Sequence, residues 1–315
     1  MQRKNIFKKI LVPVDGSPSS LIAQELTASI ARKLDSKVTV LHVVSHDFMT
    51  ERMQKLLLET RDRVPPLMGT TPTPQFSSQK RLPAPSPTFL SEEVAGEVTA
   101  WYHQRGAEIV EEAMAFFKAA GIPVEQKLID HADPAETIIR EAKRGNYGLV
   151  AIGQSEEEQE PHLGSVAKKV SRHVQTPILV ARRKRQISKM LVPVDGSEYA
   201  EKAARYAGLM ARKIDAKVTL LYVQESGIFS LRPEATKAVG TRILSDAAKR
   251  FEGIEVDQKL ESGDPAKIIT KTASKENYDI IVIGSRGLGF VERFLLGSVS
   301  DHVIHYADVP VLVIK

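Results

Sequence analysis

The residues best suited to chemistry in this chain form a glycine-rich segment in its last quarter. Residues 284–287 read Gly-Ser-Arg-Gly, and a Gly-Ser pair follows at Gly297 and Ser298. The apolar run Ile-Ile-Val-Ile at 280–283 precedes the segment, and a helical pattern over 299–306 follows it. Glycine lets a backbone approach an anion closely, and the unpaired N–H groups at a helix start bind phosphate oxygens. The order of strand, glycine loop and helix therefore predicts a phosphate cradle.

Two better-known phosphate loops do not match this segment. The chain has no G-x-x-x-x-G-K-[ST] motif, and Gly287-Leu288-Gly289 lacks the third glycine of the dinucleotide-binding fingerprint. The spacing G-x2-G-x9-G-S from Gly284 to Ser298 instead resembles the nucleotide-binding signature of the universal stress protein family.

This resemblance implies a role for each part of the predicted site. In universal stress proteins of the ATP-binding type, the Asp after the first strand meets the nucleoside and the backbone at the end of the second strand reads adenine. The glycine loop and its Gly-Ser pair take the phosphates. Carried over by position, the implied nucleotide-binding residues are Pro193, Val194, Asp195, Val223, Gly284, Arg286, Gly287, Gly297, Ser298 and Val299. The implied ligand is ATP, or AMP or ADP, alone or with Mg²⁺. A second interpretation of Asp195 is a turn that caps a helix, and the two uses can coexist.

The chain contains two copies of one long pattern. The hexapeptide VPVDGS at 12–17 recurs at 192–197, and ARKLDSKVT at 31–39 recurs as ARKIDAKVT at 211–219. Beyond the second strand the offset between the copies falls, because the first copy carries about 49 extra residues. A repeat of this length indicates two copies of a domain. We expect domains at 1–185, with an insertion at about 45–105, and at 186–315.

Each copy alternates short apolar runs with helical patterns, which predicts βαβ units and a parallel sheet covered on both faces. The predicted strands are 9–15, 38–44, 124–129, 149–153 and 176–181, and then 189–195, 218–223, 256–260, 280–284 and 309–314. The simplest fold is two flavodoxin-like α/β domains. In such sheets ligands bind at the C-terminal strand ends where the strand order reverses, here between the first and fourth strands. Asp195, Val223 and Gly284 should then meet at one crevice.

The first copy departs from the glycine pattern. Glu156 replaces the middle glycine, and four glutamates lie within 156–160, where the second copy has Arg286 and Arg293. Carboxylates repel a polyphosphate in a low-dielectric crevice, so we expect no ATP binding of the family type in the first copy. A solvated acidic loop is favoured over a cation site there. The remaining site-like positions are Asp15, Val43, Gly164 and Ser165.

The insertion has three predicted parts. Residues 46–64 suit a helix, and residues 65–87, which hold 7 of the 17 prolines, suit an extended or disordered segment. Ser91 then resembles the N-cap of a long helix that ends near Gly121. We interpret the insertion as an elaborated crossover connection, with a lid or partner-docking element as the alternative.

Composition limits the class of protein. The absence of cysteine excludes disulfides, thiolate metal sites and Cys nucleophiles. No apolar run approaches the roughly 18–20 residues of a membrane helix, and residues 1–4 do not resemble a signal peptide, so we expect a cytoplasmic protein. The net charge of +5 includes the basic run 182–185, which favours a solvated linker over a nucleic-acid contact.

No catalytic constellation is present in the sequence. It has no G-x-S-x-G elbow, no kinase loops and no paired carboxylates in the predicted phosphate site. His302 and His305 alone are weak evidence for a metal site. We therefore expect no catalytic and no metal-binding residues, and favour a nucleotide-binding sensor or regulator of a stress response. The alternatives are a slow ATPase or phosphotransferase, and a scaffold whose nucleotide pocket is vestigial.

Assembly is expected to involve the last strand of each copy. Family members commonly dimerise through this strand, and the apolar runs 176–180 and 309–313 could pair edge to edge within one chain as a pseudo-dimer. A homodimer of whole chains and an unidentified protein partner stay open.

Overall fold

A computed structural model describes residues 6–44, 92–130, 133–154, 163–182, 186–225, 233–288 and 296–315. The first half contains β1 (Lys9–Pro13), α1 (Pro18–Leu34), β2 (Lys37–Val44), α3 (Glu92–Ala119), β3 (Val124–Asp130), α4 (Pro134–Arg144), β4 (Leu149–Gly153), α5 (Ser165–His173) and β5 (Ile178–Ala181). The second half contains β6 (Lys189–Pro193), α6 (Glu198–Ile214), β7 (Lys217–Gln224), α7 (Pro233–Ala248), a 3-10 turn (Lys249–Phe251), β8 (Val256–Ser262), α8 (Pro265–Lys275), β9 (Ile280–Gly284), α9 (Ser298–Tyr306) and β10 (Val311–Ile314).

The predicted α/β class and its doubly wound architecture are confirmed, and a strand is found at each of the ten predicted runs. The strands of the two halves run in the orders β3-β2-β1-β4-β5 and β8-β7-β6-β9-β10, and pairing within each half is parallel. The order 3-2-1-4-5 is that of the first five strands of the classic dinucleotide-binding sheet, whereas flavodoxin itself has 2-1-3-4-5. The reversal lies between the first and fourth strands of each half, as expected.

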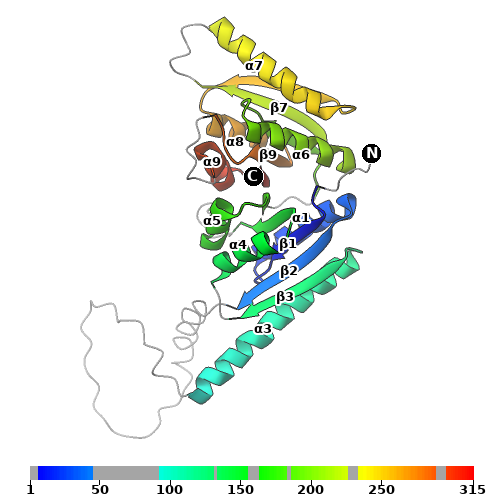
Figure 1. The fold of residues 1–315 in the computed structure, drawn as a ribbon, viewed down its shortest axis with the longest axis vertical. Coiled ribbons are helices and arrows are strands. Elements are labelled where there is room, and N and C mark those ends of the chain that lie inside the picture. Colours follow the sequence, from blue (N-terminus) through cyan, green and yellow to red (C-terminus); the bar gives the residue numbers. More distant parts are fainter. Residues whose placement is uncertain are drawn as a thin grey trace, which may run out of the picture.

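The two halves share a single ten-stranded sheet (Figure 1). β5 pairs antiparallel with β10 in the register Val180↔Val311 and Ile178↔Val313. The internal pairing of the two last strands expected from the sequence is therefore present. Because β5 also pairs with β4 and β10 with β9, neither strand keeps a free edge.

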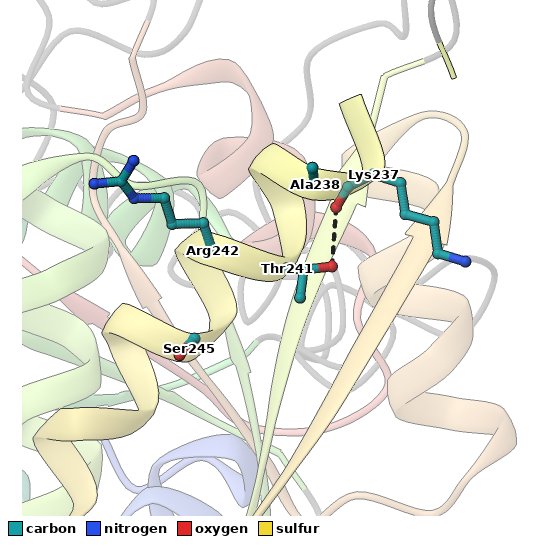
Figure 2. Close-up of a pocket in the computed structure, with 5 residues that line it drawn as sticks. All are labelled: Lys237, Ala238, Thr241, Arg242 and Ser245. Carbon is teal, nitrogen blue, oxygen red and sulfur yellow. Dashed lines mark hydrogen bonds between the residues drawn. The ribbon is translucent and has the colours of Figure 1, made fainter. Parts of the chain in front are cut away.

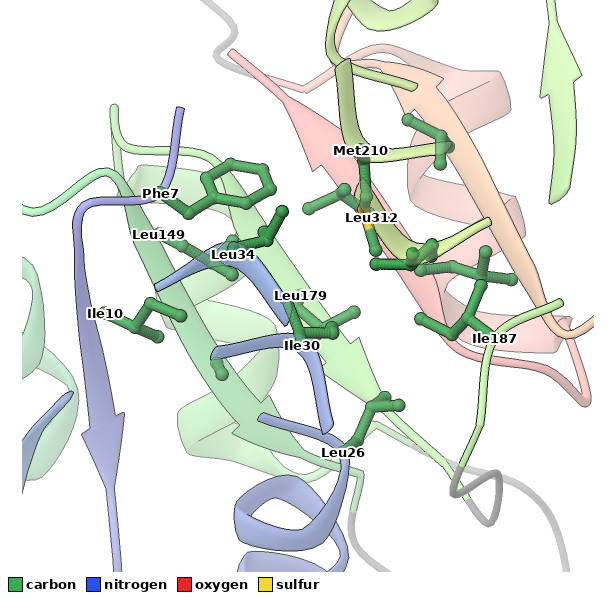
Figure 3. Close-up of a cluster of buried hydrophobic side chains, with 14 of the residues drawn as sticks. Phe7, Ile10, Leu26, Ile30, Leu34, Leu149, Leu179, Ile187, Met210 and Leu312 are labelled. Atoms are coloured by element: carbon green, nitrogen blue, oxygen red, sulfur yellow. The ribbon is translucent and has the colours of Figure 1, made fainter. Parts of the chain in front are cut away.

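Both faces of the sheet carry a core that continues from one half into the other. One core contains buried residues of α1, α3, α6 and α7, and the other contains buried residues of α4, α5, α8 and α9. Figure 3 shows the first core at the boundary, where Leu34 and Leu179 of the first half lie near Met210 and Leu312 of the second. The two domains predicted from the sequence are thus packed as one body.

Buried cations reinforce this boundary. The Arg182 guanidinium, which follows β5, donates to the carbonyl of Ile304 in α9 and, at 3.2 Å, to that of Val309. Lys315, which follows β10, donates from Nζ to the carbonyl of Ser171 in α5 at 2.7 Å. Arg182 and Lys315 hold equivalent places in the two halves, so each half supplies a cation to the last helix of the other. Burial lowers the pKa of Arg182 to about 10, against the opposing effect of Asp308.

Part of the insertion is described. The long helix is present as α3, and Gly121 follows it with φ +71°, the left-handed conformation that ends many helices. The predicted helix at 46–64, the proline-rich segment 65–87 and the N-cap Ser91 lie outside the described residues. Among the described helices, none is long and apolar enough to cross a membrane.

Replacing Arg182 tests the boundary between the halves. Arg182→Met leaves two buried carbonyls without their donor, so we expect the free energy of unfolding to fall by about 2 kcal/mol. Arg182→Lys keeps one donor and should lose about half as much. Urea unfolding measures both variants. An Arg182→Met protein as stable as the parent would contradict this role.

Candidate functional site

The predicted first-strand aspartate lies in a turn at the C-terminal edge of the sheet. Asp195 Oδ1 accepts a hydrogen bond from the Ser197 backbone N–H at 2.9 Å, and Ser197 Oγ accepts one from Ala200 N–H at 3.2 Å. Gly196 between them has φ +83°. The turn-and-cap interpretation of this segment is therefore confirmed. Pro193, buried at the end of β6, and Val194, whose N–H donates to Leu221 O at 2.9 Å, lead into this turn.

The glycine segment after β9 comes directly against this turn. A Cβ atom placed on Gly287 would lie 2.6 Å from Asp195 Oδ2, and one placed on Gly284 would lie 2.6 Å from the backbone carbon of Tyr199 in α6. The spaces beside both glycines are therefore already filled. The structure thus brings the segment that contains Gly284 and Gly287 against the Asp195 turn and the start of α6, which lie far from it in sequence.

The start of α9 lies beside the first residues of the glycine segment. The Gly297 N–H donates to Ser285 O at 2.7 Å, and Ser285 N–H donates to Ile314 O at 2.8 Å. α9 begins at the exposed Ser298, and its N-cap Gly297 supplies no side-chain hydrogen bond to the helix. Inside the helix, the buried Ser300 Oγ donates to Gly284 O at 2.7 Å. The helix start is thus anchored beside β9 without a side-chain cap, the arrangement that suits an anion.

Arg286 is bound by a partner that the sequence did not indicate. Its Nη1 donates to Tyr199 OH at 2.9 Å, and its guanidinium lies 5.2 Å from the centre of the Tyr199 ring. Its backbone carbonyl accepts Ser197 Oγ at 3.4 Å. The pKa of Lys315 falls to about 8, because of burial first and then the positive charge of Arg286. Arg286 therefore connects the glycine loop to α6, and its charge acts on Lys315 at the end of β10.

The remaining predicted residues lie at the margins of this arrangement. Val223, half-buried near the end of β7, pairs with Glu261, and Val299 is partly buried in the first turn of α9. Neighbouring Tyr222 packs so closely on α7 that a Cβ on Gly240 would lie 2.6 Å from its ring. Burial first, and then the charges of Asp195 and Glu225, raise the pKa of Tyr222. The Asp195 carboxylate is therefore close enough to the end of β7 to affect the pKa of Tyr222.

The first half repeats the scaffold with different side chains. Ser17 N–H donates to Asp15 Oδ1 at 2.9 Å, and a Cβ on Gly153 would lie 2.0 Å from Ser19 O. His42 stands where the second half has Tyr222, and its Nδ1 lies 2.7 Å from Val14 O. The predicted acidic stretch 156–160 lies outside the described residues. Val43 lies in β2, while Gly164 and Ser165 start α5 as Gly297 and Ser298 start α9.

Metal ligands do not gather in the part of the chain that the structure describes. It contains no group of three or more His, Asp or Glu residues able to hold a metal ion. His302 stacks against Tyr306 with ring centres 4.4 Å apart, and His305 Nδ1 lies 2.6 Å from Asp301 O.

A separate surface hollow lies on α7, away from the glycine loop. Figure 2 shows that residues of this one helix line it, and Thr241 Oγ1 there donates to Lys237 O at 2.9 Å. The other lining residues are Ala238, Arg242 and Ser245. None of them belongs to the predicted site, and a single helix provides no opposing wall for a ligand.

The two glycines that flank the loop should respond differently to alanine. In Gly284→Ala the new methyl group meets the backbone of Tyr199, which cannot move aside as a side chain can, so we expect a loss of about 2–3 kcal/mol. In Gly297→Ala the nearest atoms, at 3.5 Å, are at an ordinary contact distance, and the loss should stay below about 1 kcal/mol. Urea unfolding of the two proteins checks the ranking, and equal losses would refute it.

Comparisons with known proteins place this geometry in a family. The universal stress protein family model matches residues 6–64, 82–182 and 186–315. A universal stress protein of Methanocaldococcus jannaschii is 36% identical over 138 residues, which cover 40% of this chain and 81% of that protein. The crystal structure of a universal stress protein from Archaeoglobus fulgidus DSM 4304 has the same fold over both halves, with a TM-score of 0.68, 24% identity and coverage of 100% of this chain and 99% of that one. A shorter Archaeoglobus fulgidus universal stress protein, solved in complex with dAMP, is 26% identical and aligns over 41% of this chain and 98% of its own, with a TM-score of 0.35. The chain belongs to the universal stress protein family.

Proposed function

We propose that the second half of this universal stress protein binds ATP, or ADP or AMP, and that occupancy of this site is the signal in a stress response. The observation that carries the proposal is the approach of Gly287 to Asp195, where a Cβ would lie 2.6 Å from Oδ2. A side chain at position 287 would have to displace the Asp195 carboxylate, which accepts the Ser197 N–H at 2.9 Å. The approach joins the nucleoside side of the predicted site to its phosphate side. Family membership supports the same ligand class.

Each part of the site has a chemical task under this proposal. One oxygen of Asp195 is used by the turn, whereas Oδ2 can accept a hydrogen bond from a ribose hydroxyl. The backbone near Val223 would read the adenine edge. Gly287 and Ser298 would offer N–H groups to the phosphates, since α9 lacks a side-chain cap. Gly297, whose N–H donates to Ser285 O, would hold the helix start in place. Pro193, Val194, Gly284 and Val299 would shape the crevice.

Arg286 would add a positive charge on the phosphate side of the site. Tyr199 holds its guanidinium by a hydrogen bond and by ring contact. Mg²⁺, where present, would arrive with the polyphosphate, because Mg²⁺ usually keeps several waters and binds to substrate phosphates.

One ATP per chain is the stoichiometry that we expect from calorimetric titration. Gly287→Glu puts a carboxylate beside Asp195 and the phosphates, so ATP affinity should fall at least about 100-fold. Gly164→Glu is the control in the first half, where position 156, the counterpart of Gly287, is already glutamate. It adds a carboxylate at Gly164, the N-cap of α5, as Gly297 is of α9. This control should bind ATP as the parent does.

Other outcomes of the titration favour other functions. Two equal ATP sites per chain would contradict the expectation that the first half does not bind ATP. Failure of the parent protein to bind any adenine nucleotide, both in titration and when denatured protein is assayed for released nucleotide, would favour a scaffold.

We further propose that the protein is a sensor and not an enzyme, and that it acts in the cytoplasm. Phosphoryl transfer needs a residue that positions the attacking nucleophile, and the described residues 284–288 and 296–298 and the Asp195 turn show none in that role. Incubation with ATP and Mg²⁺ should therefore yield no ADP above the buffer control. ADP formation that is lost in Gly287→Glu would instead support a slow ATPase or phosphotransferase.

A further inference from the structure

The phosphate-side helix of the second half is bound by an arginine of the first half. Arg172 of α5 donates from Nε to Asp301 Oδ1 at 2.9 Å and from its second terminal nitrogen to Asp301 Oδ2 at 2.8 Å. Asp301 lies in the first turn of α9, and its N–H donates to Gly297 O at 2.9 Å. This two-point pair therefore links the start of α9 to the other half of the chain.

A carboxylate at this position opposes the binding of phosphate. A helix start favours one negative charge near its free N–H groups, and the side chain of Asp301 leans toward that end. Asp301 follows Ser298 by three residues, a rise of about 4.5 Å along the helix. At such separations an unbalanced carboxylate and a polyphosphate repel each other appreciably.

Asp301 keeps its negative charge in the folded protein. Burial raises its pKa, but the hydrogen bonds from Arg172 and the charges of His305, Arg172 and Lys168 bring the pKa below its usual value. Lys168 and Arg172 face it from α5, and His305 from its own helix. The charge must therefore be balanced by a neighbour, and Arg172 is the one that forms the two-point contact.

The two halves are not equivalent at this contact. Lys168 occupies the place of Asp301 in α5, since its N–H donates to Gly164 O at 2.9 Å as Asp301 N–H does to Gly297 O. His305 occupies the place of Arg172. The symmetric counterpart of the Arg172–Asp301 pair would join Lys168 to His305, two bases, so an ion pair of this kind forms on one side alone. That side belongs to the half with the intact glycine loop.

We propose that Arg172 is a positioning residue for the nucleotide site of the other half, which makes the start of α9 receptive to a polyphosphate by holding and balancing Asp301. The proposal rests on the nucleotide-binding function argued above. It gives the first half a part in the site even though its own loop is acidic.

Three variants and two ligands test this inference. Arg172→Met should weaken ATP binding about 10-fold and leave adenosine binding unchanged, because adenosine carries no phosphate. Asp301→Asn should bind ATP at least as tightly as the parent. The double variant, which removes both charges of the pair, should return to about the ATP affinity of the parent, and the effect of Arg172→Met should shrink in high salt. Lys169→Met, which removes a cation of the same helix as Arg172 and breaks its pair with Glu136 of α4, is the matched control and should bind like the parent.

The outcomes separate this inference from the proposed function. A parent that binds neither ATP nor adenosine would refute the nucleotide site itself. A parent that binds ATP, with an Arg172→Met variant of equal ATP affinity, would refute the role of Arg172 alone. Equal loss of ATP and adenosine in Arg172→Met, or a double variant that stays weak, would show a structural role and overturn the charge argument.

Discussion

The antiparallel pairing of β5 with β10 is the constraint on which the rest of the molecule depends. It turns two five-stranded sheets into one and leaves both strands buried on both edges and both faces. It also brings α5 close enough to α9 for Arg172 to contact Asp301, and close enough to the end of β10 for Lys315 to contact Ser171. A strand so apolar would invite pairing with another chain if it were left exposed, and the duplication supplies that partner internally.

Duplication has preserved the scaffold and changed the side chains that face the crevice. Both halves keep the same Asp–Gly–Ser turn and the same glycine at the end of the fourth strand, because a side chain at Gly153 or Gly284 would strike the backbone of the first helix of its half, α1 or α6. At residues 42 and 222, histidine replaces tyrosine, and each ring packs closely on a glycine of the neighbouring helix, Gly106 in α3 and Gly240 in α7. The side chains at the strand ends therefore differ between the halves while the packing of the scaffold is kept.

The sequence could predict the strands, caps and glycine loop because each depends on a local pattern. Runs of Val and Ile indicated the strands, although β1 and β6 end at Pro13 and Pro193, two residues before the predicted ends, because the Asx turn starts there. Contacts between distant residues were not predictable in this way. Arg286 with Tyr199, Arg172 with Asp301 and Arg182 with Ile304 join residues 87, 129 and 122 positions apart. For the same reason the sequence predicted two domains but did not show that each core spans both of them.

Covalent linkage explains why the two halves can be charged differently where they meet. In a symmetric dimer of first halves, Lys168 and Arg172 would face each other twice, and four cations would gather with no acid among them. In a symmetric dimer of second halves, Asp301 would face His305, which is charged only when protonated. Pairing the unlike halves sets Arg172, always charged, against Asp301 in a geometry that satisfies both carboxylate oxygens. An aspartate near the start of α9 is then tolerable, because its partner Arg172 is part of the same chain and stays beside it at any dilution.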